Sequence, residues 1–244
     1  MPYTYNSFQQ ALALEMVIPN ANVSDPNFQA ILPTIIDEAE QRCYRDLDLL
    51  YATAAQTTVM TPGARSISIA HADSLPQILI LETMNVITPS TATNPEAGLR
   101  NQLYPVSKEF LDAVFGSAAG SGVPKYMAML TDATVLVGPW PDQGYTVEFI
   151  GKYRPVPLYS AAPADGTQTT FLSSVLPDLF LAAAMVSAAG YRHNFGAQSD
   201  EPRMAISWEA RYQQNLLSAK NEEMRKKFHG WGGTSSEQTP PPSP

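Results

Sequence analysis

The chain of 244 residues is poor in the residue types on which most metal and enzymatic chemistry depends. It contains one cysteine, Cys43, so no disulfide can form within the chain. Its three histidines, His71, His193 and His229, lie far apart in sequence and form no pair at ligand spacing. We therefore expect no metal site, no cofactor and no catalytic residue.

Charged residues are also scarce, at 16% of the chain against 44% hydrophobic residues, and the net charge is −8. A nucleic-acid-binding protein would present a basic field, which this composition does not supply. A negative wall remains compatible with a DNA channel to which DNA does not adhere. Residues 1–50 carry seven acids and two bases, whereas residues 203–229 carry six bases and three acids. Such complementary ends suit docking within the chain or between copies.

No segment is long and apolar enough to cross a membrane. The most apolar run, residues 179–189, is about half the length that a membrane helix requires. The first four residues, Met1-Pro2-Tyr3-Thr4, lack the basic segment and apolar core of a signal peptide. We expect a soluble chain, and its single cysteine fits assembly in a reducing cytoplasm.

Motifs of catalysis and nucleotide binding are missing as well. The glycine-rich stretch 116–122 lacks the spacing of a phosphate-binding loop, and no G-x-S-x-G elbow is present. Asp132, Asp142 and Glu148 could be imagined as glycosidase carboxylates, but acids at turns and strand edges are common.

The middle of the chain is rich in aromatic residues that admit two interpretations. A face of stacked rings could bind sugars or bases, but at strand spacing such residues more often pack a sheet. The residues in question are Trp140, Tyr126, Tyr145, Tyr153 and Tyr159.

Hydrophobic periodicity predicts helices at both ends of the chain. The first covers about 4–16, with Ser7 and Gln10 at capping-box spacing. The second covers about 26–51 and follows the N-cap Asp25. Near the other end, a helix over about 173–189 is apolar nearly all round, which predicts burial on most sides. An amphipathic helix follows over about 202–228.

Between these helices, prolines and glycines separate short strand-like runs. Pro62-Gly63 and the turn 130–133 are typical of hairpins. One helix is expected near 107–115, with Ser107 as its cap. The predicted strands are 57–60, 66–70, 78–86, 126–130, 134–137 and 145–153.

The order of elements predicts an α+β fold: a helical bundle formed by N- and C-terminal helices, with an inserted antiparallel β-rich domain of sandwich or barrel type. The expected domains are 1–55 plus 171–229 for the bundle, 56–170 for the insertion, and 230–244 for an extended Gly/Pro-rich tail. The expected core anchors of the bundle are Phe28, Ile35, Leu47, Leu179, Trp208 and Tyr212.

Several landmarks occur in an order that resembles the head-to-tail adaptor (connector) proteins of short-tailed and related bacteriophages. They extend over about residues 25–228. They are Arg45-Asp46-Leu47 at the end of an early helix, Pro139-Trp140-Pro141-Asp142 before a strand, Tyr153-Arg154-Pro155, Leu176-Pro177-Asp178-Leu179, and the pair Trp208 and Tyr212.

The resemblance implies a non-enzymatic virion protein that forms a ring, commonly of twelve copies, beneath the portal. Its bundle would dock to the portal protein and its β domain would face the next tail component, a nozzle or tail tube. Packaged DNA would pass through the centre without sequence-specific binding, and the ring would be assembled in the host bacterial cytoplasm.

The basic end of the last helix is the expected portal-docking site. Cations there would steer onto an acidic surface, and aromatic residues would then be buried. These residues are Arg225, Lys226, Lys227, Phe228 and Trp231. Two alternative functions share much of this pattern: another tail or head-completion ring protein, and a carbohydrate-binding or depolymerising tail protein.

Overall fold

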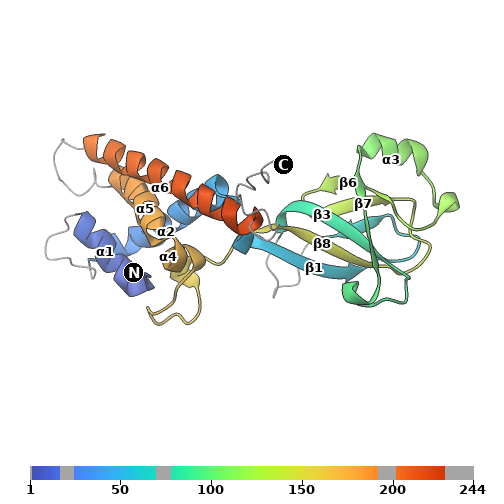
Figure 1. The fold of residues 1–244 in the computed structure, drawn as a ribbon, viewed down its shortest axis with the longest axis horizontal. Helices are drawn as coiled ribbons and strands as arrows, with labels where there is room; N and C mark the ends of the chain where they lie inside the picture. Colours follow the sequence, from blue (N-terminus) through green and yellow to red (C-terminus); the bar gives the residue numbers. More distant parts are fainter. Residues whose placement is uncertain (1, 17–24, 70–77, 192–201, 229–244) are drawn as a thin grey trace, which may run out of the picture. The chain divides into compact units, whose positions relative to one another are not determined.

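The computed structural model describes residues 2–16, 25–69, 78–191 and 202–228. Contacts divide the chain into two compact units (Figure 1). The helical unit consists of Met1–Tyr51 and Val156–Pro244, and the β unit of Ala52–Pro155. The expected α+β fold is confirmed, with helices from both ends flanking a β-rich region.

One helix forms the centre of the helical unit. This helix, α5, contacts each of the others (Figure 1). Every side chain from Leu179 to Met185 is buried, as the apolar sequence predicts. Alanines at 182–184 let the neighbouring helices approach closely. The helices are α1 (Tyr5–Glu15), α2 (Pro26–Asp46), α4 (Phe171–Val175), α5 (Pro177–Tyr191) and α6 (Pro202–Phe228).

Two of these helices, α1 and α4, begin with the same reciprocal cap. Thr4 accepts a hydrogen bond from the Ser7 backbone N–H, and the Ser7 side chain accepts one from the Thr4 N–H. Thr170 and Ser173 repeat this arrangement at α4. The expected box of Ser7 and Gln10 is wrong, because Ser7 is the third residue of the helix and not its cap.

The start of the chain is tied to the segment before α5. The Tyr3 N–H donates to the Ser173 carbonyl at 2.8 Å, and the Asn6 N–H donates to that of Gly166 at 3.0 Å. Gly166 has φ +90° and lies against the Asn6 side chain, where a Cβ would overlap it. Phe8 of α1 stacks on Phe180 of α5 with ring centroids 4.4 Å apart. These contacts hold α1 on the central helix.

The β unit contains two four-stranded sheets. Their strand orders are β1-β8-β3-β4 and β2-β7-β6-β5. All pairings between these strands are antiparallel except that of β5 with β6. The strands are β1 (Thr53–Val59), β2 (Ser66–Ser68), β3 (Ile78–Thr88), β4 (Leu99–Gln102), β5 (Tyr104–Pro105), β6 (Tyr126–Thr131), β7 (Thr134–Gly138) and β8 (Thr146–Tyr153).

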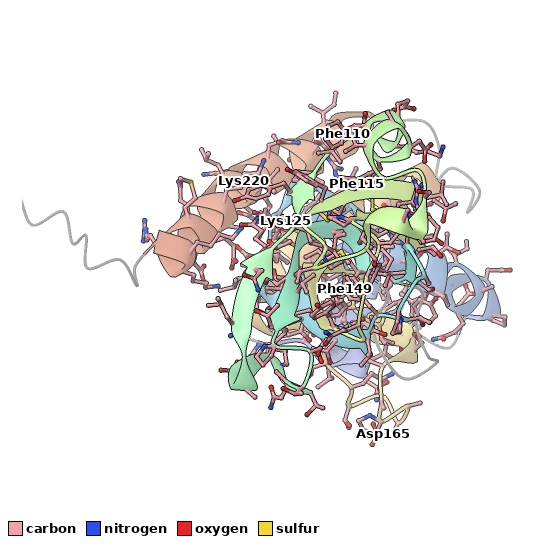
Figure 2. All side chains as sticks on the ribbon, turned by 90° about the vertical axis from the view of Figure 1, so that its right-hand side faces the viewer. Phe110, Phe115, Lys125, Phe149, Asp165 and Lys220 are labelled. Atoms are coloured by element: carbon pink, nitrogen blue, oxygen red, sulfur yellow. The ribbon has the colours of Figure 1, made fainter. Side chains whose placement is uncertain are left out.

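The two sheets enclose one core, which makes the β unit a sandwich. Val86 of β3 and Phe149 of β8 meet Val135 and Val137 of β7 there. Phe149 is labelled among these strands in Figure 2. A short helix, α3 (Lys108–Val114), packs on the outer side of the second sheet through Leu111. Phe110 of α3 and Phe115, directly after it, both contact the ring of Tyr126 of β6. Figure 2 labels these two phenylalanines.

Several boundaries differ from those expected. The first strand begins at Thr53, and Pro62-Gly63 joins β1 to a strand of the other sheet instead of closing a hairpin. Strands β4 and β5 were not expected. Residues 156–170 belong to the helical unit and not to the β-rich insertion. Contacts between residues distant in sequence place them there, because the Leu158 N–H and the Thr170 hydroxyl both donate hydrogen bonds to Glu40 of α2.

Candidate docking site

The last turn of α6 carries three consecutive cations, Arg225, Lys226 and Lys227. Cations at this end complement the partial negative charge of the helix C-terminus. Arg225 and Lys226 are exposed, and Lys227 is half-buried. Phe228 ends the helix, although its side chain is not among those described, and Trp231 lies outside the described residues.

Lys226 is held against the helical unit. Its Nζ lies 2.9 Å from Glu222 Oε1 and 2.8 Å from Glu223 Oε1. The same nitrogen lies 5.6 Å from the ring centroid of Phe171, which is within cation–π range. Partial burial acts to lower the pKa of Lys226, but hydrogen bonds with Glu223 and Glu222 outweigh it and raise that pKa above its usual value.

Glu223 connects this helix end to the chain that follows α2. Its side chain is only 5% exposed. One carboxylate oxygen binds Lys226, and the other accepts the Leu50 N–H at 3.1 Å. The next residue, Tyr51, stacks on Phe171 of α4 with ring centroids 4.5 Å apart. The end of α6 is therefore fixed to two other parts of the helical unit.

Lys227 forms an ion pair with Asp48. Two of the three cations expected to steer onto the portal are thus used within the chain. The acid of the Lys227 pair is exposed, and such ion pairs contribute little stability, so this contact serves mainly to orient the helix end. Arg225 is the cation of this turn that extends into solvent.

A second polar cluster lies between α2 and α6. Arg42 binds Glu209 at 2.6 Å and lies 4.0 Å from the ring centroid of Tyr212. The Tyr212 hydroxyl donates to Asp46 Oδ2 at 2.7 Å. The hydrogen bond from Arg42 lowers the pKa of Glu209, and burial raises that of Tyr212. These contacts set the lateral position of α6 on α2.

Glu40 is the buried carboxylate of α2, with only 3% of its surface exposed. It accepts the Leu158 N–H on both oxygens, at 3.3 and 3.2 Å, and the Thr170 hydroxyl at 3.3 Å. Burial raises the pKa of Glu40 to about 8, although these hydrogen bonds oppose the rise. The neighbouring thiol of Cys43 is also buried, which raises its pKa to about 12 and leaves it unreactive.

The structure places most of the expected core anchors in the interior of the helical unit. The buried ones are Phe28, Ile35, Leu47, Leu179 and Tyr212. Trp208 differs from the expectation, because its indole is half-buried on the side of α6 with Arg211 5.0 Å from its ring. Tyr212, one turn further, is the enclosed aromatic residue of this pair.

The side chains considered for sugar chemistry in the β unit have structural partners. Tyr145 is buried and its hydroxyl donates to Asp142, while Glu148 binds Arg100 and Asn85. The Trp140 indole donates to the Phe115 carbonyl at 2.7 Å. Asp132 lies in the exposed turn between β6 and β7. These acids do not face a common cleft in any described contact.

Other features of the described residues supply no reactive centre. A groove of about 450 Å³ runs between β3, β6 and the start of α3, lined mainly by apolar side chains. Its lysine, Lys108, is paired with Asp112 at 2.6 Å. No cluster of three potential metal ligands and no helix able to cross a membrane is found in the described ranges. His71, His193 and His229 lie outside them.

Helices from both ends of the chain form one unit, the inserted sandwich forms the other, and the last helix ends in three cations. The chain belongs to the SU10 adaptor protein family, whose model matches residues 3–233. This is a phage head-to-tail adaptor family, so the chain is a bacteriophage virion component. The resemblance inferred from the sequence is confirmed. A search of curated proteins finds no match to the chain.

Sequence reasoning missed the acids that hold the helix end. Glu223 lies three residues before Lys226, a spacing at which helical side chains interact, so this pair could have been anticipated. No sequence signal marks Asp48 or Leu50, because both reach α6 only through the fold. Glu40 carries a weak signal: it follows Ile36 by four residues, on a helix side that is otherwise apolar.

Proposed function

We propose that this chain forms a closed ring that docks beneath the portal and joins it to the next tail component, a nozzle or tail tube. Rings of this kind commonly contain twelve copies. The observation that carries the proposal is the family match, which extends over residues 3–233 and so includes both units.

The helical unit would contact the portal, and the β unit would contact the tail. Five residues of the last helix and beyond would form the portal contact: Arg225, Lys226, Lys227, Phe228 and Trp231. The structure supports a division of roles among them. Lys226 and Lys227 orient the helix end through Glu223 and Asp48, while Arg225 is exposed and available to an acidic partner surface.

The charge of the chain supports passage of DNA through the ring without sequence-specific binding. A net charge of −8 disfavours adhesion to a polyanion. Assembly would take place in the host bacterial cytoplasm, where the buried thiol of Cys43 stays reduced. The protein would have no catalytic activity. Two of the three acids considered for it have structural partners: Glu148 binds Arg100 and Asn85, and Asp142 accepts the Tyr145 hydroxyl.

The docking role is tested by the binding of the full chain to the purified portal of its phage. We expect Arg225→Glu to weaken binding by roughly tenfold or more, because it reverses a charge at the interface. Lys220→Glu is the matched control, since Lys220 is an exposed cation on the same helix (Figure 2). Truncation after Gly230 should leave folding intact and weaken binding. Failure of the unaltered chain to bind the portal would overturn the proposal.

A further inference from the structure

The β unit has four sheet edges, and they differ in how open they are to another strand. Natural proteins protect edges by making them short, by placing charges or proline on them, or by bulges. Strand β2 has three residues, β5 has two and ends at Pro105, and β4 has four with Arg100 among them. Strand β1 has seven residues, Thr53–Val59, with no charge and no proline.

The pairing of β1 with β8 is regular along its whole length. Seven consecutive residues pair without a bulge, whereas β3 pairs with β8 through two register shifts. No other described strand pairs with β1. Ala55, Thr57 and Val59 are exposed and share the outer face of the sheet. A long, regular and uncharged edge of this kind is suited to pairing with an additional strand.

The strand at the opposite edge of the same sheet, β4, runs in the direction needed for antiparallel pairing with β1. Strands in the order β1-β8-β3-β4 alternate in direction, since each adjacent pair is antiparallel. With four strands, β4 therefore runs opposite to β1. If a second copy continues the sheet by rotation about an axis parallel to the strands, its β4 lies antiparallel beside β1 of the first.

The register can be limited further from the faces of the sheet. Thr57 pairs with Glu148, Glu148 with Asn85, and Asn85 with Gln102, so all four side chains share the outer face. Directly paired residues must lie on the same face. Gln102 of one copy is then opposite Thr53, Ala55, Thr57 or Val59 of the next, and not opposite Gln56.

The charge of β4 does not oppose such pairing. Arg100 is the charged residue of this strand, and its guanidinium is bound to Glu148 at 3.0 Å and to Glu96 at 2.6 Å. Both partners lie in the same β unit. A neighbouring β1, which is uncharged, therefore meets a strand whose cation is already neutralised.

We propose that β1 of one copy pairs antiparallel with β4 of the next, so that the sheet β1-β8-β3-β4 continues from copy to copy. This inference rests on the proposed ring and identifies the contact that builds it. Each copy carries one β1 and one β4, so a head-to-tail arrangement pairs every β1 with a β4 only when the ring closes.

The test is thiol cross-linking of the full chain, both free at high concentration and bound to the portal. Gln102→Cys is combined in turn with Thr53→Cys, Ala55→Cys, Thr57→Cys and Val59→Cys, and each double variant is treated with a short bismaleimide. We expect at least one combination to give a ladder of linked copies that ends at the size of the ring. Gln102→Cys with Gln56→Cys, on opposite faces, should give no ladder. The natural Cys43 is buried and should not react.

Rings without a ladder from any outer-face pair would overturn the inference and leave the proposed function standing. Cross-linked dimers of a variant with one introduced cysteine, placed on β1, would also overturn the inference. They would indicate that β1 pairs with β1 of another copy. Absence of both rings and portal binding would contradict the proposed function as well. A ladder that forms with the outer-face pairs alone supports the inference.

A matched pair of lysine variants gives a second measurement. Ala55 lies on β1 and Ala113 on α3, and both are exposed. Ala55→Lys should raise the concentration needed for ring assembly by roughly tenfold or more, because an edge lysine opposes strand addition. Ala113→Lys should leave assembly unchanged, and both variants should keep the melting temperature of the unaltered chain. Equal assembly of the two variants would contradict the inference.

Discussion

Replacement of Glu40 by glutamine should change how the stability of the chain depends on pH. Glu40 is 3% exposed, and burial raises its pKa from the ordinary 4.5 to about 8. The folded chain therefore keeps a proton on Glu40 at pH values where the unfolded chain has lost it. The stability associated with this proton is fully present below pH 4.5 and is lost as the pH rises toward 8.

The size of the effect follows from the two pKa values. One pKa unit corresponds to about 1.4 kcal/mol. The difference between 4.5 and about 8 therefore corresponds to a loss of about 5 kcal/mol in the free energy of unfolding across that interval. Glu40→Gln cannot ionise, yet it keeps an oxygen that accepts the Leu158 N–H or the Thr170 hydroxyl. The variant should be close to the unaltered chain at pH 5 and more stable at pH 9.

The assay is urea unfolding followed by circular dichroism at intervals from pH 5 to pH 9. Glu38→Gln, on the exposed side of the same helix, is the matched control. The negative charge of nearby Asp37 and the neutral thiol of Cys43 are present in all three chains, so the difference between curves isolates Glu40. Parallel curves for the unaltered chain and Glu40→Gln would refute the assigned pKa and its cause.

Two further predictions concern packing in the helical unit. Tyr212→Ala should cost about 3–5 kcal/mol because Tyr212 is fully buried, whereas Trp208→Ala should cost only about 1–2 kcal/mol because its indole is half-buried. Equal losses in chemical denaturation would contradict this ranking. Ala183→Leu should lower the free energy of unfolding by about 1–3 kcal/mol, since Ala183 of α5 is fully buried and leaves no room for a larger side chain. Ala210→Leu on the exposed side of α6 serves as its control, and a Tm unchanged in both variants would mean that α5 is loosely packed.

The fold was predictable where the local pattern and the tertiary structure agree. The apolar run of α5 could only be a central helix, and the strand-like composition of 126–137 and 145–153 predicted β6, β7 and β8 closely. Strand β4 has the sequence Leu99-Arg100-Asn101-Gln102, which has little β propensity, and forms because β3 offers it an edge. The sequence of β4 alone therefore does not predict that it forms a strand, because the strand depends on its partner.

The basic end of α6 was predictable from the sequence, but not all of the contacts that its cations make within the chain. Arg225, Lys226 and Lys227 are visible as a basic helix end, and the spacing of Glu223 anticipates its pair with Lys226. Asp48 and Phe171 reach Lys227 and Lys226 only after the chain has folded. Residues 156–170 resemble a strand linker in composition. Their place in the helical unit depends on Glu40, whose hydrogen bonds span more than 100 positions of sequence.

The most direct test of the account is electron microscopy of the complex formed by the purified full chain and the purified portal of its phage. The account predicts a closed ring of this chain, coaxial with the portal, with the helical units against the portal and the β units on the tail side. Attachment of separate copies at the side of the portal, or a ring bound through its β units, would contradict it.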